Sequence, residues 1–266
     1  MVNPNYWDYR EDRITETQLA IAHACYKGEI TLVDYWFGQL MERVRTLNLL
    51  EDTWVIFLSD HGFYFGEHGQ FGKRRFRWPD SSIFDEGFAK GMSMAQQTVH
   101  WSPLHQEVTR VPLMIRAPLT EGGRTEALVT LPDVMPTILE VLGVAIPERV
   151  QGRSLTPIVR GETDAVHPFV VTSAPFEEIG QLSKTVDDQS RTVVEISPSS
   201  ITDGTWDLLY GVSGQEPLLY RTKEDPGHRH NVADAHPDVV RNLHRLYADW
   251  LAEISTPENT SVRAVS

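Results

Sequence analysis

An apolar run that ends in an Asp-His-Gly turn constrains this chain more than any other stretch. Val55–Leu58 is continuously apolar and predicts a buried strand, after which the chain passes through Asp60, His61 and Gly62. In open α/β sheets, ligands bind just outside the carboxyl ends of the strands. Asp60 and His61 offer a carboxylate and an imidazole there, and Gly62 lets the backbone turn close to a ligand. The pair predicts half of a metal site, so the remaining ligands must come from elsewhere.

Composition excludes several classes of partner. The chain has 266 residues, of which 41% are hydrophobic, enough to form a sizeable core. The formal net charge of −13 argues against a nucleic-acid partner, because neutralising phosphates needs clustered Lys and Arg. No apolar stretch reaches the length of a membrane span. The single cysteine, Cys25, excludes an intramolecular disulfide, and we expect no signal peptide in the opening residues; the compartment stays open between cytoplasm and periplasm.

Helical and strand patterns alternate in the first part of the chain. Apolar residues recur at helical spacing over residues 16–47, and Thr15 with Gln18 predicts a capping pair at the start. A strand over residues 53–59 completes one αβ unit. Strands are also expected at 111–115 and 127–130, and a helix at 133–142 that ends at Gly143. We therefore predict an α/β fold with a doubly wound, mostly parallel sheet within residues 1–165.

The pattern changes after residue 166. Segments rich in strand-forming residues occur at 168–173, 191–197, 205–212 and 217–222, and a helix is expected at 237–254. We predict a small α+β subdomain over residues 166–266, with an antiparallel sheet and a terminal helix. Histidines are frequent here, but no Cys or acid framework surrounds them, so His228, His230, His236 and His244 are expected to be ordinary surface residues.

Several motifs occur in an order typical of one enzyme family. The first are S-D-H-G at 59–62, G-E-H-G at 66–69, G-K at 72–73 and R-V-P-L-M-I-R-A-P at 110–118. Later ones are L-P-D-V-M-P-T at 131–137, V-Q-G-R-S-L at 150–155, E-P-L-L-Y at 216–220, and D-P-G at 225–227 with Asn231. Together they resemble the carboxy-terminal half of a sulfatase of the alkaline phosphatase superfamily. The resemblance implies an alkaline phosphatase-like fold.

The resemblance also implies roles for matching residues. Asp60 and His61 correspond to metal ligands, and Lys73 to the lysine that holds the sulfate ester. The metal implied is Ca²⁺, with Mn²⁺ or Zn²⁺ as alternatives because His61 suits a transition metal. His68 is a candidate for substrate contact, or else it stabilises its loop. The expected substrate is a sulfated small molecule or carbohydrate.

One part of the family pattern is missing from this sequence. The family's nucleophile is a Cys or Ser in a C/S-x-P-x-R motif, oxidised to formylglycine, and neither this motif nor the family's Asp-Asp metal pair after the first strand has a match here. Cys25 has neither the Pro nor the Arg, so it is not that nucleophile. We expect a truncated or split sulfatase-type hydrolase that self-associates or needs a complementary amino-terminal segment. The alternatives are a phosphomonoesterase or phosphodiesterase of the same superfamily, or a noncatalytic binding or assembly module.

Residues 76–107 depart from the family pattern as an insertion after the G-K motif. The segment contains several aromatic residues and predicts a lid beside the site, or else an ordered surface excursion or interface. His100 and His105 lie within it. Either could reach a cleft, but an isolated loop histidine is more often solvated.

Overall fold

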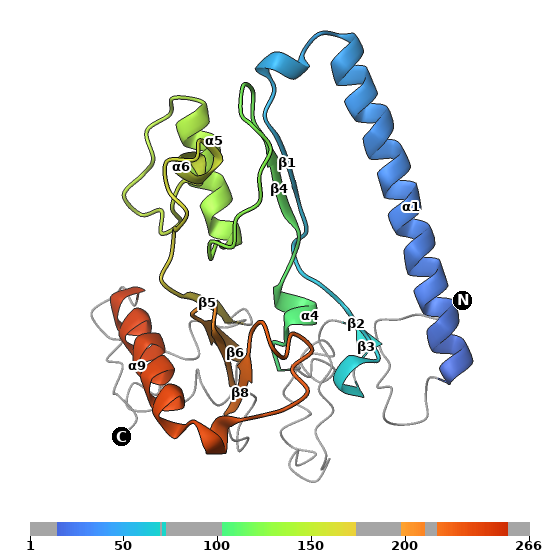
Figure 1. The fold of residues 1–266 in the computed structure, drawn as a ribbon. Helices are drawn as coiled ribbons and strands as arrows, with labels where there is room; N and C mark the ends of the chain where they lie inside the picture. The colour runs from blue at the N-terminus through green and yellow to red at the C-terminus, as the bar shows by residue number, and fades with distance from the viewer. Residues whose placement is uncertain (1–14, 70, 73–102, 174–197, 211–216, 255–266) are drawn as a thin grey trace, which may run out of the picture. The chain divides into compact units, whose positions relative to one another are not determined.

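The computed structural model describes residues 15–69, 71–72, 103–173, 198–210 and 217–254 (Figure 1). Contacts divide the chain into two compact units. The first unit comprises Met1–His23, Gly62–Thr109 and Val171–Ser266, and the second comprises Ala24–His61 and Arg110–Val170. The division of the sequence into residues 1–165 and 166–266 stays a prediction.

In the second unit, two of the expected strands pair with each other. β1 (Val55–Leu58) lies beside β4 (Leu113–Arg116), and the 3-10 helix η3 (Leu50–Asp52) precedes β1. The pairing is antiparallel, with Val55 opposite Arg116. The expected mostly parallel sheet is therefore not seen in this pair. The doubly wound sheet stays a prediction.

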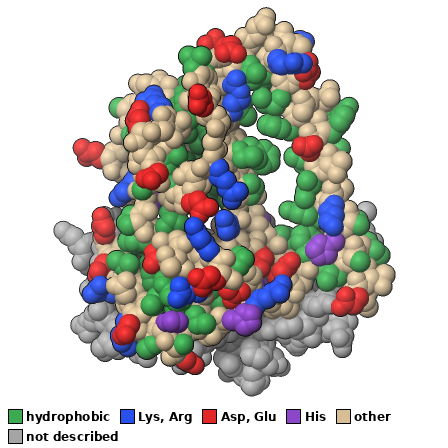
Figure 2. All heavy atoms as spheres, in the orientation of Figure 1, with side chains coloured by type: hydrophobic (Ala, Val, Ile, Leu, Met, Phe, Trp, Pro, Cys, Tyr) green, Lys and Arg blue, Asp and Glu red, His purple; other side chains and the backbone are tan. Residues whose placement is uncertain are grey.

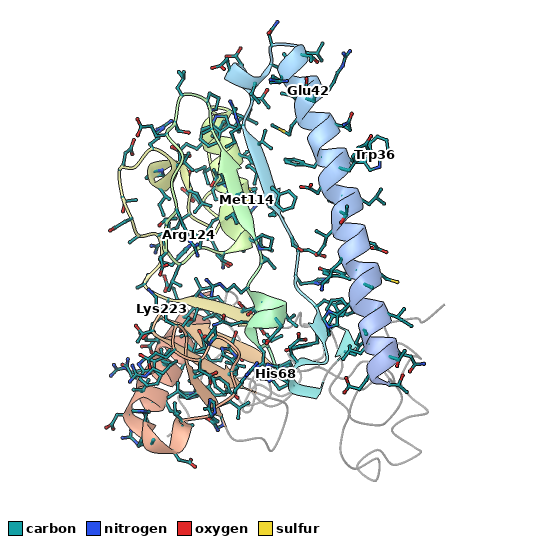
Figure 3. All side chains as sticks on the ribbon, turned by 45° about the vertical axis from the view of Figure 1, so that its right-hand side comes forward. Trp36, Glu42, His68, Met114, Arg124 and Lys223 are labelled. Carbon is teal, nitrogen blue, oxygen red and sulfur yellow. The ribbon has the colours of Figure 1, made fainter. Side chains whose placement is uncertain are left out.

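The long helix α1 spans Glu16–Thr46, as its apolar spacing predicts. The predicted cap is present: the Thr15 N–H donates to Gln18 Oε1 (2.8 Å), and the Gln18 N–H donates to Thr15 Oγ1 (3.2 Å). None of the helix residues is buried, and hydrophobic side chains are visible along it in Figure 2. Trp36 is 62% exposed and projects from the side of α1 that faces away from β1 (Figure 3). The helix therefore presents a large uncovered apolar surface.

A buried carboxylate organises the helices of the second unit. The chain runs through η6 (Leu131–Asp133), α5 (Val134–Val141) and α6 (Thr156–Val159). The predicted helix at 133–142 is confirmed, and Gly143 follows it with a left-handed φ of 66°. The Asp133 carboxylate is fully buried and accepts hydrogen bonds from the N–H groups of Thr130 (2.8 Å) and Arg153 (2.7 Å). His167 Nε2 donates to it as well, at 2.9 Å.

The strand expected at residues 127–130 does not form. Thr130 is extended, but it is the N-cap of η6, and its N–H donates to the Asp133 carboxylate rather than to a neighbouring strand. The apolar run at 127–130 therefore leads into a helix cap and not into a sheet.

The first unit contains the expected small antiparallel sheet and terminal helix. The strand order is β5 (Val170–Ser173), β6 (Ser199–Thr202), β7 (Trp206–Tyr210) and β8 (Leu218–Arg221). β7 pairs antiparallel with both β6 and β8, and α9 (Pro237–Ile254) follows η8 (Ala233–Ala235) and packs against β6 and β7 (Figure 1). The core residues are Ile201, Leu208, Leu209, Leu219, Leu243 and Tyr247. β6 was not predicted, and the segment predicted at 191–197 lies outside the described residues.

A short hairpin and one helical turn complete the first unit. β2 (Tyr64–Phe65) pairs antiparallel with β3 (Phe71–Gly72) around η4 (Glu67–Gly69), and α4 spans Gln106–Thr109. Tyr64 is buried, and its hydroxyl donates to the Pro103 carbonyl (2.7 Å). Among the residues described, no helix combines the length and apolarity needed to cross a bilayer.

Candidate functional site

The predicted metal ligands Asp60 and His61 converge at the carboxyl end of β1. The Asp60 Oδ2 atom lies 3.2 Å from His61 Nε2, and the His61 N–H donates to Asp60 Oδ1 at 2.9 Å. The Asp60 side chain is 81% exposed. One carboxylate oxygen and one imidazole nitrogen therefore lie close enough to bind the same ion.

Gly62, the next residue, is fixed by backbone contacts within the first unit. Its N–H donates to the Val108 carbonyl (2.8 Å), and the N–H of Phe63 donates to the Glu107 carbonyl (2.9 Å). A Cβ on Gly62 would lie 1.8 Å from the Glu107 oxygen, which no side chain can tolerate. Glycine is thus required here by close approach of the Glu107 backbone, whereas the predicted close approach to a ligand stays a prediction.

His68 lies in η4 with a left-handed backbone, at a φ of 54° (Figure 3). Its Nε2 lies 3.3 Å from each oxygen of the Glu107 carboxylate. A carboxylate only accepts, so His68 Nε2 carries the proton and donates. A non-glycine residue in this conformation is uncommon and is often held there for a local reason. The Glu107 contact supports the interpretation that His68 stabilises its loop, and its predicted substrate contact is untested.

Lys73, the predicted sulfate clamp, lies outside the described residues, as does His100. Most of the predicted lid at 76–107 also lies outside them, apart from residues 103–107. The structure therefore brings Asp60 and His61 together, and it gives His68 partners in α4 and at His105. Those partners were not predicted.

A second group of ionisable side chains is buried in the first unit. His105 and His228 are 4% and 3% exposed, and their Nδ1 atoms are 3.1 Å apart. His228 Nε2 donates to Asp207 Oδ2 (3.0 Å), which also accepts from Gln106 Nε2 (2.7 Å). The expectation that His228 is a surface residue is wrong, and so is the interpretation of His105 as a solvated loop histidine. Sequence offers no local signal for either, because the pairing joins positions 123 residues apart.

Burial controls the protonation of this group. Burial, together with the nearby rings of His68 and His228, lowers the pKa of His105 to about 2. Burial alone would raise the pKa of Asp207, but hydrogen bonds from His228, Thr202 and Gln106 outweigh it, and the pKa lies below 3.8. Glu107 behaves likewise: burial opposes its ionisation, and the hydrogen bond from His68 brings its pKa below 4.5. At neutral pH the two carboxylates are charged and His105 is neutral.

The other predicted surface histidines differ in exposure. The His230 side chain is 82% exposed, as expected. His236 and His244 are half-buried, the first packing on Trp206 and the second accepting from or donating to the Tyr210 hydroxyl at 2.6 Å. Trp206, Tyr210 and Tyr220 are all buried in the core.

Asp60 and His61 fit part of a divalent-metal shell. A carboxylate oxygen is a ligand for hard cations such as Ca²⁺, and an imidazole admits Mn²⁺ or Zn²⁺. Within the part of the chain that the structure describes, no three His, Cys, Asp or Glu side chains are grouped so as to hold a metal ion. The pair can therefore contribute to a site but does not complete one.

Comparisons with known proteins agree with the motifs. The Sulfatase family profile matches residues 5–144. Arylsulfatase K of Xenopus laevis is 26% identical over 239 residues, which cover 86% of this chain and 37% of that protein. N-acetylglucosamine-6-O-sulfatase of Bacteroides thetaiotaomicron is 29% identical over 139 residues, covering 52% of this chain and 20% of that protein. The crystal structure of the phosphonate monoester hydrolase of Agrobacterium radiobacter is similar in fold, with a TM-score of 0.67 and 22% identity over 95% of this chain and 47% of that one.

These similarities describe the chain's length relative to its relatives, its fold and its family. The chain spans less than half the length of the relatives and the solved structure it matches. The fold is of the type found in sulfatases and phosphonate hydrolases of the alkaline phosphatase superfamily. More than half of the chain, including the Asp60-His61 turn, lies within the match to one family profile. The chain therefore belongs to the sulfatase family.

Proposed function

We propose that this chain forms part of a metal-dependent hydrolase of sulfate esters. The observation that carries the proposal is the convergence of Asp60 and His61, 3.2 Å apart at the end of β1, inside the region that matches the sulfatase family. The exposed carboxylate and the adjacent imidazole have the chemistry of metal ligands. Their position after a strand is where α/β folds bind ligands.

Asp60 and His61 would hold one side of a divalent metal, with Ca²⁺ preferred and Mn²⁺ or Zn²⁺ as alternatives. When bound, the metal supplies positive charge that stabilises the nonbridging oxygens of a sulfate ester. The hydrogen bond from the His61 N–H to Asp60 Oδ1 orients the carboxylate, leaving Oδ2 beside the imidazole nitrogen. The pair thus holds one possible oxygen ligand and one possible nitrogen ligand 3.2 Å apart.

Lys73 and His68 would act on the ester itself. An ammonium group on Lys73 would neutralise an ester oxygen as a compact point charge. His68 already donates from Nε2 to Glu107, so only its Nδ1 is left for a substrate contact. A sulfated carbohydrate is the substrate class we favour, because the name of one relative, N-acetylglucosamine-6-O-sulfatase, specifies a sulfated sugar.

The attacking group is not supplied by this sequence, which contains no C/S-x-P-x-R motif. A formylglycine nucleophile and further metal carboxylates would have to come from another polypeptide segment. Binding the sulfate anion alone does not lower the barrier to cleavage of the ester, because no nucleophile is present to attack the sulfur. We therefore expect the 266-residue chain alone to bind sulfate weakly and to show no turnover of an aryl sulfate.

Two other functions have support of their own. The similarity in fold to a phosphonate monoester hydrolase favours a phosphoester substrate as the second candidate. A noncatalytic assembly module is the third, since α1 has no buried residue and would be covered by a complementary amino-terminal segment or a second copy of the chain. Comparing turnover of sulfate and phosphonate esters distinguishes the sulfatase from the phosphoester hydrolase. Reconstitution with a nucleophile-bearing segment distinguishes both enzymes from a noncatalytic assembly module.

Metal binding is the direct test. Titration calorimetry with Ca²⁺ and Mn²⁺ should show weak binding by the unmodified chain and none by Asp60→Ala. Asp249→Ala, which removes an exposed carboxylate from α9, is the matched control and should bind as the unmodified chain does. Tight binding that survives Asp60→Ala would place the metal elsewhere and overturn the assignment.

Activity is tested by reconstitution. The chain should be mixed with a separately expressed segment from a sulfatase that carries the C/S-x-P-x-R motif, and turnover of aryl sulfate and aryl phosphonate esters compared. Sulfate-selective turnover that is lost in Lys73→Ala supports the proposal. Phosphonate-selective turnover would favour the second candidate. Turnover by the chain alone that survives both Lys73→Ala and Asp60→Ala would show that the active site is misplaced.

A further inference from the structure

The buried histidines of the first unit link three parts of the chain that lie far apart in sequence. His105 precedes α4, His228 follows β8, and Asp207 belongs to β7. His68 stacks on His105 with parallel rings 3.6 Å apart, and Tyr220 stacks on His228 at 4.4 Å. Like His68, His228 has a left-handed backbone, with a φ of 46°. His68 and His228, which both contact His105, thus share an uncommon backbone conformation.

The hydrogen-bond geometry allows one arrangement of protons when the rings are neutral. His228 Nε2 faces the Asp207 carboxylate at 3.0 Å, and a carboxylate accepts only, so this nitrogen carries the proton. The Nδ1 atom of a neutral His228 is then an acceptor. His105 Nδ1, 3.1 Å away, must therefore be the protonated nitrogen that donates to it. The Asp207 carboxylate thereby fixes the tautomer of a ring that it does not touch.

A metal ion between the two rings is not supported. Two facing nitrogens are half of a tetrahedral shell. The nearest other ring, His68, directs Nε2 to Glu107, and no set of three metal-binding side chains is found among the residues described. His105 and His228 are therefore joined by one N–H···N hydrogen bond.

This contact has consequences for the residues around the proposed site. His105 begins the turn that leads into α4, and its N–H donates to the Tyr64 hydroxyl (3.3 Å). Two residues later, Glu107 holds His68 through its side chain and Phe63 through its carbonyl. The position of His105 therefore determines where the partners of His68 and Gly62 lie.

We propose that His105 and His228 are positioning residues, joined by one proton between their Nδ1 atoms, which fix His68 and Glu107 against the carboxy-terminal sheet. The inference rests on the proposed function only in the role of His68 toward substrate. A second proton on the facing nitrogens would leave two donors opposed, so acid should open the contact.

The surrounding groups agree with a contact that stays closed near neutral pH. The ionisable groups facing the pair are His68 from η4, Glu107 from α4, Asp207 from β7 and Tyr220 from β8, with Tyr64 behind His105 and Asp225 beside Tyr220. Burial and the charge of Asp225 raise the pKa of Tyr220 to about 12, so Tyr220 stays neutral. The pKa values of Glu107 and Asp207 are lowered from 4.5 and 3.8, so both carboxylates stay ionised between pH 5 and 8. Burial lowers the pKa of His105 to about 2, so the contact stays closed over that range and opens only in strong acid.

The test is ¹⁵N-histidine NMR on the full chain, which distinguishes Nδ1–H from Nε2–H tautomers. At pH 8, His105 should be the Nδ1–H tautomer and His228 the Nε2–H tautomer. The His105 tautomer should persist as the pH is lowered from 8 to 5, because burial lowers the pKa of His105 to about 2. A His105 ring with its proton on Nε2, or signals that respond to added Zn²⁺ before they respond to acid, would overturn the proposal.

Variants at His228 separate positioning from packing. His228→Asn can return an acceptor near the Nδ1 position and should retain the His105 tautomer and the His68 signals, whereas His228→Leu should lose both. His230→Leu, at a neighbouring exposed histidine, should change neither. If His228→Leu does not fold, the tautomers of the unmodified chain still decide the question. Since no variant touches Asp60, failure here is distinct from failure of the metal titration.

Discussion

A Cβ atom placed on Gly62 would lie 1.8 Å from the carbonyl oxygen of Glu107. That carbonyl accepts the N–H of Phe63, and the next one accepts the N–H of Gly62 itself. A methyl group would therefore push apart two backbone segments and break both hydrogen bonds. The turn after His61 is built on a contact that only glycine permits.

Gly62→Ala should lower the free energy of unfolding by about 2–4 kcal/mol, the range for lost buried hydrogen bonds combined with a steric clash. Urea denaturation measures it. Gly122→Ala is the matched control, because Gly122 has no atom within 4 Å of its would-be Cβ, and it should change stability little. Equal effects of the two substitutions would contradict the role of the close contact.

Asp133→Asn should destabilise the second unit by about 3 kcal/mol, since removing one partner of a buried charged hydrogen-bond set leaves the others unsatisfied. The amide retains the shape of the carboxylate but accepts with only one oxygen. In the unmodified chain, donors from Thr130, Arg153 and His167 share the two carboxylate oxygens of Asp133. Asp249→Asn, on the exposed face of α9, is the control for unfolding experiments. An Asp133→Asn protein as stable as that control would show that the carboxylate charge is unimportant.

Stability should decrease as the pH falls from 7.5 to 5.5. The unfolded chain protonates His105 below its ordinary pKa of 6.5, whereas the folded chain does not, because burial lowers the folded pKa to about 2. The stabilisation is therefore complete above pH 6.5 and is lost progressively toward pH 2. Between pH 7.5 and pH 5.5, the low pKa of one such buried histidine should lower the free energy of unfolding by about 1 kcal/mol. A difference of one bound proton between the folded and unfolded chain changes this free energy by about 1.36 kcal/mol per pH unit.

The carboxylates do not obscure this effect. The pKa values of Glu107 and Asp207 are lowered from 4.5 and 3.8, so their contribution is lost only at more acidic pH. Burial also lowers the pKa of His244, which adds to the decrease in the same direction. His105→Gln should reduce the slope of unfolding free energy against pH, and His230→Gln should not. A slope unchanged in His105→Gln would mean that another group is responsible.

The apolar surface of α1 should drive association of the chain. Trp36 and Leu40 are one helical turn apart and mostly exposed, and burying such side chains contributes about 1.5–3 kcal/mol each. The double substitution Trp36→Glu and Leu40→Glu should reduce concentration-dependent association in sedimentation experiments. Glu42→Gln on the same helix should leave it unchanged. If the unmodified chain stays a monodisperse monomer, the expectation that this apolar surface drives association is contradicted.

Local patterns predicted the three longest helices and the strands β1, β4, β5, β7 and β8, but they missed β6 and the short helices α4 and α6. α1, α5 and α9 follow apolar spacing and end signals, such as Thr15 and Gly143, that act within one helical turn. β6 is Ser-Ser-Ile-Thr, and its polar residues gave no sign of a strand that forms only because β7 pairs with it. The antiparallel register of β1 and β4 likewise depends on partners 61 residues apart along the chain, at Val55 and Arg116.

The candidate site was predictable only in part. Asp60 and His61 are neighbours in sequence, so their convergence follows from the turn that carries them. The partners of His68 and His228 are 39 and 123 residues away, at Glu107 and His105, and no periodic pattern encodes such distances. Buried polar pairs of this kind form because each polar atom must find a partner once the surrounding core excludes water.

The Asp133 carboxylate has a consequence for hydrogen exchange. It accepts the backbone N–H groups of both Thr130 and Arg153, which are 23 residues apart in sequence. Neither amide can exchange with solvent deuterium unless it leaves this one side chain. If the carboxylate moves as a unit, the two amides share one opening free energy, and their protection factors should be equal and respond equally to denaturant. Two distant points of the backbone would thus report a single event.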